Sequence, residues 1–152
     1  MNYPMYTHSV PVFKQMLTAL QTILVQTAEH VAAKSIEPDA LLQARLFPDM
    51  FPLVKQVQIA ADFSRGIAAR LAGVDVPVLE SNQKTFGDLD ALLTQTLAFL
   101  DSVTSAQFEG KEGIEIVLRP GTPKEKKLSD GGDPLGFGLL AFNKTFCLRV
   151  QL

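Results

Sequence analysis

Three long segments of this chain repeat apolar side chains at intervals of three and four residues, the spacing that places one apolar stripe along an α-helix. The first segment reads from about Val10 to Ala33 and the second from about Met50 to Ala72. The third begins at Thr85 and ends near Thr104. Three such stripes are buried most simply against one another, so the pattern predicts a mainly α protein built as a helical bundle.

Capping residues mark the ends of these predicted helices. Ser9 is the expected N-cap of the first helix, and Asp49 that of the second. Gly73 stands where a left-handed C-cap is expected. Thr85 followed by Asp88 is similar to a capping box and predicts the start of the third helix.

The second predicted helix is unusually rich in small side chains, and a short helical turn at 38–42 precedes it. A thin helix lets its neighbours approach the backbone closely, so we expect this helix to be the central one. Its small residues are Ala60, Ala61, Gly66, Ala68, Ala69 and Ala72.

The pattern changes after the third helix. Apolar residues alternate over 114–118, a Pro/Gly-rich turn follows, and 127–129 could return as a second strand, which predicts a small β-hairpin. Residues 137–152 fit either the start of a helix or a strand, and this alternative stays open.

Length and composition limit what the chain can do. At 152 residues it is expected to be a single domain over 1–152. The formal net charge of −2 argues against a nucleic-acid partner, and no apolar run is long enough to span a bilayer. One cysteine, Cys147, indicates a reducing compartment, so we expect a cytoplasmic protein with a buried structural thiol.

Several motifs resemble one protein family. The run Arg45-Leu-Phe-Pro-Asp-Met-Phe-Pro-Leu53 is the most specific, and 56–60, 70–73, 97–101 and 108–110 agree with it. Over about residues 5–119 the chain resembles the bacterial and fungal family called domain of unknown function nineteen-ninety-three. That family belongs to the DinB/YfiT-like superfamily of four-helix bundles.

The resemblance implies a bundle with a long crossover connection, a hairpin before the last helix, and frequent homodimers. Here residues 137–152 depart from the family's long fourth helix. We therefore expect a DinB-like bundle with three long helices, a small β-hairpin and a shortened or altered fourth helix. Such a bundle would leave apolar faces uncovered, so we expect a second copy of the chain to cover them.

The superfamily often binds a divalent metal through three histidines, one of them on the second helix. This chain has only His8 and His30, which bracket the first helix. They are 22 positions apart, which corresponds to about 33 Å at the rise of an α-helix, so they cannot share a metal within one chain. No metal ligand or cofactor is predicted, and a divalent metal is implied by the superfamily resemblance alone.

Polar residues at the mouth of the bundle are the candidate ligand-binding set. Arg45, Asp49 and Gln56 could line a pocket for a small molecule. The competing interpretation is structural, with Asp49 as a helix cap and Arg45 paired to Asp49 or to a nearby carbonyl. Lys55 and Asp62 are expected to form a solvated helix face.

Two functions follow from these observations. The leading hypothesis is a metal-free binding or scaffold protein that acts as a homodimer and has no identified catalytic residue. The alternative, implied by the superfamily, is a metal- or thiol-dependent transferase or hydrolase.

Overall fold

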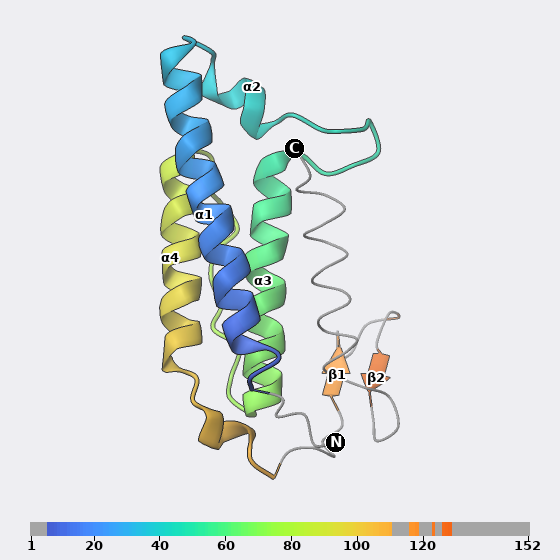
Figure 1. Cartoon of the computed structure of the whole chain (residues 1–152). Coiled ribbons are helices and arrows are strands. Elements are labelled where there is room, and N and C mark those ends of the chain that lie inside the picture. The colour runs from blue at the N-terminus through green and yellow to red at the C-terminus, as the bar shows by residue number, and fades with distance from the viewer. Residues whose placement is uncertain (1–5, 111–115, 119–122, 124–125, 129–152) are drawn as a thin grey trace.

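Three long helices form the body of the molecule in the computed structural model (Figure 1). The structure describes residues 6–110, 116–118, 123 and 126–128. Its elements are α1 (Val10–Ala33), α2 (Pro38–Leu42), α3 (Leu53–Ala72), α4 (Phe86–Ser102), the 3-10 turn η1 (Ser105–Phe108), and the strands β1 (Ile116–Leu118) and β2 (Lys126–Leu128). The expectation of a mainly helical protein with three long helices is confirmed.

The helices do not simply alternate in direction. Figure 1 shows α1 running one way along the bundle and α3 and α4 both running the other way. Because α3 and α4 are parallel, the chain between them must return along the whole length of the bundle. Residues 73–85, here termed the long connection, do this and confirm the crossover that the family resemblance implied.

The contact between α1 and α4 is antiparallel and carries polar cross-links at two levels. Lys14 forms an ion pair with Asp101. Two turns farther along α1, Gln21 Nε2 donates hydrogen bonds to Asp90 Oδ1 at 2.7 Å and to Thr94 Oγ1 at 3.0 Å. These pairs fix the register in which the apolar stripes of α1 and α4 meet.

Helix α3 is the central helix, as its small side chains predicted. Fourteen of its 20 residues are buried, against six of 24 in α1. Its apolar stripe packs into a continuous core with the inner faces of α1 and α4. The largest fully buried side chains of that core are Phe13, Leu17, Leu20, Leu24, Leu42, Leu89, Leu93 and Leu100.

Most of the predicted helix ends agree with the structure, and one is wrong. Helix α3 begins at Leu53 with Pro52 as its N-cap residue, so Asp49 does not cap it and the helix does not start at Met50. The reason is local, because a residue that precedes proline is sterically disfavoured in the helical conformation. Phe51 precedes Pro52 and therefore stays outside the helix.

The other caps vary in how they work. Gly73 closes α3 in the left-handed conformation, with φ 67° and ψ 34°, as predicted. Ser9 occupies the N-cap position of α1 but makes no side-chain cap hydrogen bond. Its hydroxyl instead donates to the carbonyl of Tyr6 at 3.3 Å.

Two short strands follow η1. They pair antiparallel, with Val117 opposite Lys127. The rest of the segment expected to form a hairpin, the segment 137–152 expected to hold a shortened or altered fourth helix, and Cys147 lie outside the described residues. Within the described residues, no helix is long and apolar enough to cross a membrane.

The capping box of α4 makes a testable prediction about pH. Asp88 Oδ2 accepts hydrogen bonds from the backbone N–H groups of Lys84 and Thr85, both at 3.0 Å, and these bonds lower the pKa of Asp88 below its ordinary value of 3.8. The cap therefore stabilises the fold fully above that ordinary pKa, and its contribution is lost as pH falls through the lower folded pKa. Urea unfolding of the parent protein and of Asp88→Asn should show a smaller stability difference at about pH 2 than at about pH 6. An equal difference at both pH values would contradict this role for the carboxylate.

Candidate functional site

The predicted pocket residues lie around the connection between α2 and α3, residues 43–52, here termed the short connection. Arg45 Nη1 donates to the carbonyls of Met50 at 3.2 Å and Pro48 at 3.5 Å. Gln56 Nε2 donates to the carbonyl of Phe51 at 2.7 Å. Both side chains thus bind the backbone of this connection and hold it in shape.

The three predicted side chains differ in their surroundings. Asp49 is exposed, whereas Gln56 is buried, with 2% of its surface exposed. No hydrogen bond or ion pair joins Arg45, Asp49 and Gln56 to one another in the described part of the chain. A role in ligand binding stays a prediction, and the observed contacts of Arg45 and Gln56 are structural ones.

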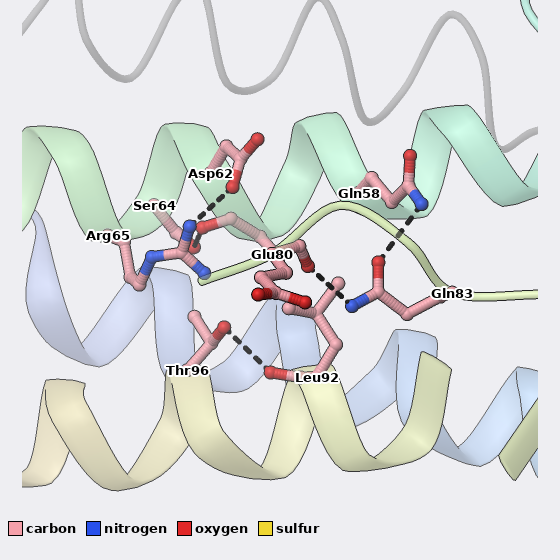
Figure 2. Close-up of polar contacts among 9 residues, drawn as sticks. Gln58, Asp62, Ser64, Arg65, Glu80, Gln83, Leu92 and Thr96 are labelled. Carbon is pink, nitrogen blue, oxygen red and sulfur yellow. Dashed lines mark hydrogen bonds and ion pairs between the residues drawn. The ribbon is translucent and has the colours of Figure 1, made fainter. Parts of the chain in front are cut away.

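A second polar group lies where the long connection meets α3 (Figure 2). Gln58 Nε2 donates to Gln83 Oε1 at 3.0 Å, and Gln83 Nε2 donates to the carbonyl of Glu80 at 2.7 Å. Near the other end of α3, the backbone N–H of Val74 donates to the carbonyl of Ala69 at 2.9 Å. The long connection is therefore tied to α3 at both ends of its path.

Arg65 is the most unusual residue of this group. It retains only 4% of its surface exposed, and its Nη2 forms an ion pair with Asp62 Oδ1. Among the described residues, its Nε and Nη1 are buried without a hydrogen-bond partner. Buried arginines normally have their donors satisfied, so this guanidinium has unused binding capacity.

Sequence reasoning missed Arg65 for an identifiable reason. The apolar stripe that predicted α3 marks only one of its faces, and Arg65 lies beside that stripe. A second face of α3 is buried as well, and the long connection that is tied to α3 at Gln58 has no periodic signal. Asp62 was expected on a solvated face with Lys55; its side chain is 46% exposed, but it is paired with Arg65.

The hydroxyl groups nearest to this group are already engaged. Ser64 Oγ donates to the carbonyl of Ala61 at 2.9 Å, and Thr96 Oγ1 donates to the carbonyl of Leu92 at 2.8 Å. Each bond lies within one helix, as is common for hydroxyls in helix interiors. Neither hydroxyl is therefore arranged with a general base as a nucleophile would require.

The residues on α3 do not fit the three-histidine metal site of the superfamily. This helix contains no histidine, and the amides of Gln56 and Gln58 are used to hold the two connections. His8 precedes α1, and His30 lies in its last turn. Among the residues that the structure describes, no three His, Cys, Asp or Glu side chains form a group that could hold a metal ion.

Comparison with known proteins agrees with this fold. The sequence profile of the family described as Domain of unknown function (DUF1993) matches residues 5–136. The chain belongs to this family. A DinB family member protein from Shewanella denitrificans, known from its crystal structure, is 27% identical with a TM-score of 0.80, over 94% of this chain and 78% of that chain. No curated protein matches the chain.

These findings confirm the resemblance that the sequence motifs gave. The matched range covers all three long helices and both connections of this DUF1993 protein. The specific motif at 45–53 now has a structural meaning, since it forms most of the short connection and the first residue of α3.

Two substitutions compare a buried side chain that holds the short connection with an exposed side chain of that connection. Gln56→Ala removes the donor that binds the Phe51 carbonyl and leaves a buried gap, so we expect a loss of about 1 to 3 kcal/mol in the free energy of unfolding. Asp49→Ala removes an exposed side chain that caps no helix, and we expect a change within about 0.5 kcal/mol. Urea denaturation measures both. Equal losses for the two variants would contradict the assignment of a structural role to Gln56 and an exposed one to Asp49.

Proposed function

We propose that this protein is a binding or scaffold protein that acts as a homodimer and carries no catalytic metal. The observation that carries the proposal is a group of exposed apolar side chains on the short connection. Leu46, Phe47 and Phe51 are 48%, 64% and 47% exposed. We term these three residues the apolar loop group.

The apolar loop group has properties that favour a protein partner. Aromatic side chains are enriched at protein interfaces because each buries a large area with few rotatable bonds. The hydrogen bonds of Arg45 and Gln56 to the carbonyls of the same connection hold it in a defined shape. A shaped apolar surface loses less conformational entropy on binding than a flexible one.

A second copy of the chain is the partner we favour. Homodimers with two-fold symmetry are the commonest soluble oligomers, and their interfaces pair one surface patch with itself. An apolar patch is self-complementary in this sense, whereas a strongly charged patch would repel its copy. The net charge of −2 adds little repulsion between two chains.

The proposed absence of a catalytic metal is supported by the residue types on α3. This helix contains no histidine, the residue type that the superfamily resemblance implies as its helical ligand. The transferase or hydrolase alternative would need ligands supplied from elsewhere.

The dimer is tested by size-exclusion chromatography with light scattering over a range of concentrations. We expect Phe47→Ser to raise the dissociation constant of the dimer at least about tenfold, because it removes the most exposed apolar side chain of the group. Val78→Ser is the matched control, since Val78 is 95% exposed but lies on the long connection. A monomeric parent protein would sink the proposal, and so would a dimer that both variants weaken equally.

The metal-free part is tested by thermal unfolding with Zn²⁺, Ni²⁺ or Mn²⁺. A site filled at 100 times its dissociation constant would add about 2.7 kcal/mol and raise the unfolding midpoint. We expect no such increase. A midpoint increase that His8→Ala or His30→Ala abolishes would instead favour the metal-dependent enzyme.

A further inference from the structure

The short connection is a closed loop that projects from the bundle between α2 and α3 (Figure 1). Its two ends meet where the backbone N–H of Leu53 donates to the carbonyl of Ala44 at 3.0 Å. Its tip is a tight turn, in which the backbone N–H of Met50 donates to the carbonyl of Phe47 at 3.0 Å. Asp49 is one of the two central residues of this turn, so it lies at the tip of the loop.

Arg45 is fixed against this turn without pairing to its carboxylate. Its Nη1 donates to the carbonyls of Pro48 and Met50, the residues on either side of Asp49. Both Arg45 and Asp49 are exposed. Among the described residues, Nε and Nη2 of Arg45 and the carboxylate of Asp49 have no hydrogen-bond or ion-pair partner. A cation and an anion at the loop tip are therefore both available to a partner.

The apolar loop group lies among these two charges in the sequence. Phe47, its most exposed member at 64%, is the midpoint between Arg45 and Asp49. An apolar centre with charged groups at its rim is the usual composition of a protein interface. Here the rim carries one charge of each sign, at equal distances along the chain from the central aromatic residue.

This arrangement of charges is complementary to itself. In a two-fold interface, residue i of one chain contacts residue j of the other, and j contacts i. With the axis beside Phe47, Arg45 of each copy faces Asp49 of the other copy. Both charges are then paired at once, whereas two charges of the same sign would meet their own kind across the axis and repel.

We propose that Arg45 and Asp49 form reciprocal ion pairs across the two-fold axis of the homodimer, and that these pairs select a second copy of the chain as the partner of the apolar loop group. This inference rests on the proposed homodimer and adds the side chains that determine its register. Arginine suits the role because its planar fork can bind a carboxylate through two hydrogen bonds. Exposed ion pairs add little affinity, so their effect is on the choice of partner and on alignment.

The test reverses each charge in the full chain and measures dimers by analytical ultracentrifugation. Asp49→Arg gives each copy two cations at the loop tip, and Arg45→Asp gives it two anions. At low salt we expect each change to raise the dissociation constant of the homodimer at least about tenfold, because like charges then meet across the axis. An equimolar mixture, with one variant fluorescently labelled, should form a heterodimer as tight as the parent dimer, because opposite charges meet again.

Two controls isolate the charge effect at the loop. Glu29→Arg changes the net charge by the same amount as Asp49→Arg, but from an exposed position on α1, and should leave the dissociation constant unchanged. Raising NaCl to about 1 M shortens the Debye length to about 3 Å. At that salt, the dissociation constant of Asp49→Arg should approach that of the parent protein in the same buffer.

The outcomes separate this inference from the homodimer itself. A parent dimer that Asp49→Arg weakens no more than Glu29→Arg would overturn the ion pairs and leave the homodimer in place. A mixture that forms no more heterodimer than random exchange would overturn them too. A monomeric parent protein would overturn both, and a different protein would then be the partner of the apolar loop group. If Arg45→Asp does not fold, the salt response of Asp49→Arg decides alone, since that variant keeps the carbonyl contacts of Arg45.

Discussion

Close packing around α3 is the constraint on which the rest of the molecule depends. A helix that is buried over most of its circumference must be thin, and its alanines and Gly66 meet that requirement. It must also satisfy the polar groups that it buries, because an unpaired buried polar atom is costly. Gln58 and Ser64 bond to protein acceptors, whereas Gln56 and Arg65 meet the second requirement only in part, since Gln56 Oε1 and two nitrogens of Arg65 are buried without a partner among the described residues.

The two glutamines show how one helix organises both of its connections. Gln56 and Gln58 are two residues apart, so they leave α3 about 200° apart around its axis. One amide binds the short connection at Phe51, and the other binds the long connection at Gln83. Two polar residues of one helix thus fix the paths of the chain on either side of it.

The sequence predicted what depends on local periodicity and capping chemistry. The bounds of α1 and α2, the left-handed Gly73 and the Thr85–Asp88 capping box are all as expected. The start of α3 was predicted too early because the apolar pattern extends to residues before Pro52. The steric effect of Pro52 on Phe51 outweighs that pattern and keeps Phe51 outside the helix. Asp49 was predicted to cap this helix, and it lies in the short connection instead.

Arg65 could not be found in this way, since the apolar periodicity of α3 marks only one of its faces. An arginine beside an apolar stripe is usually a solvated residue with a long flexible side chain. Here Arg65 is buried, and nothing periodic in residues 74–84 reveals where the long connection will lie. One sequence signal was present at Arg65. Three of its four neighbours on the helix surface are alanines, so it has few side chains to pack against.

The antiparallel contact of α1 with α4 also determines when the molecule can become stable during its synthesis. Lys14 and Asp101 are 87 positions apart in sequence, and Gln21 and Asp90 are 69 apart. The chain must close a loop of this size before α1 reaches its main partner, and the entropy of loop closure opposes that step. A nascent chain that ends within α3 therefore exposes the apolar stripe of α1 to water. The stripe gains its cover only once about two-thirds of the 152 residues have been made, and until then it is open to chaperones or to other nascent chains.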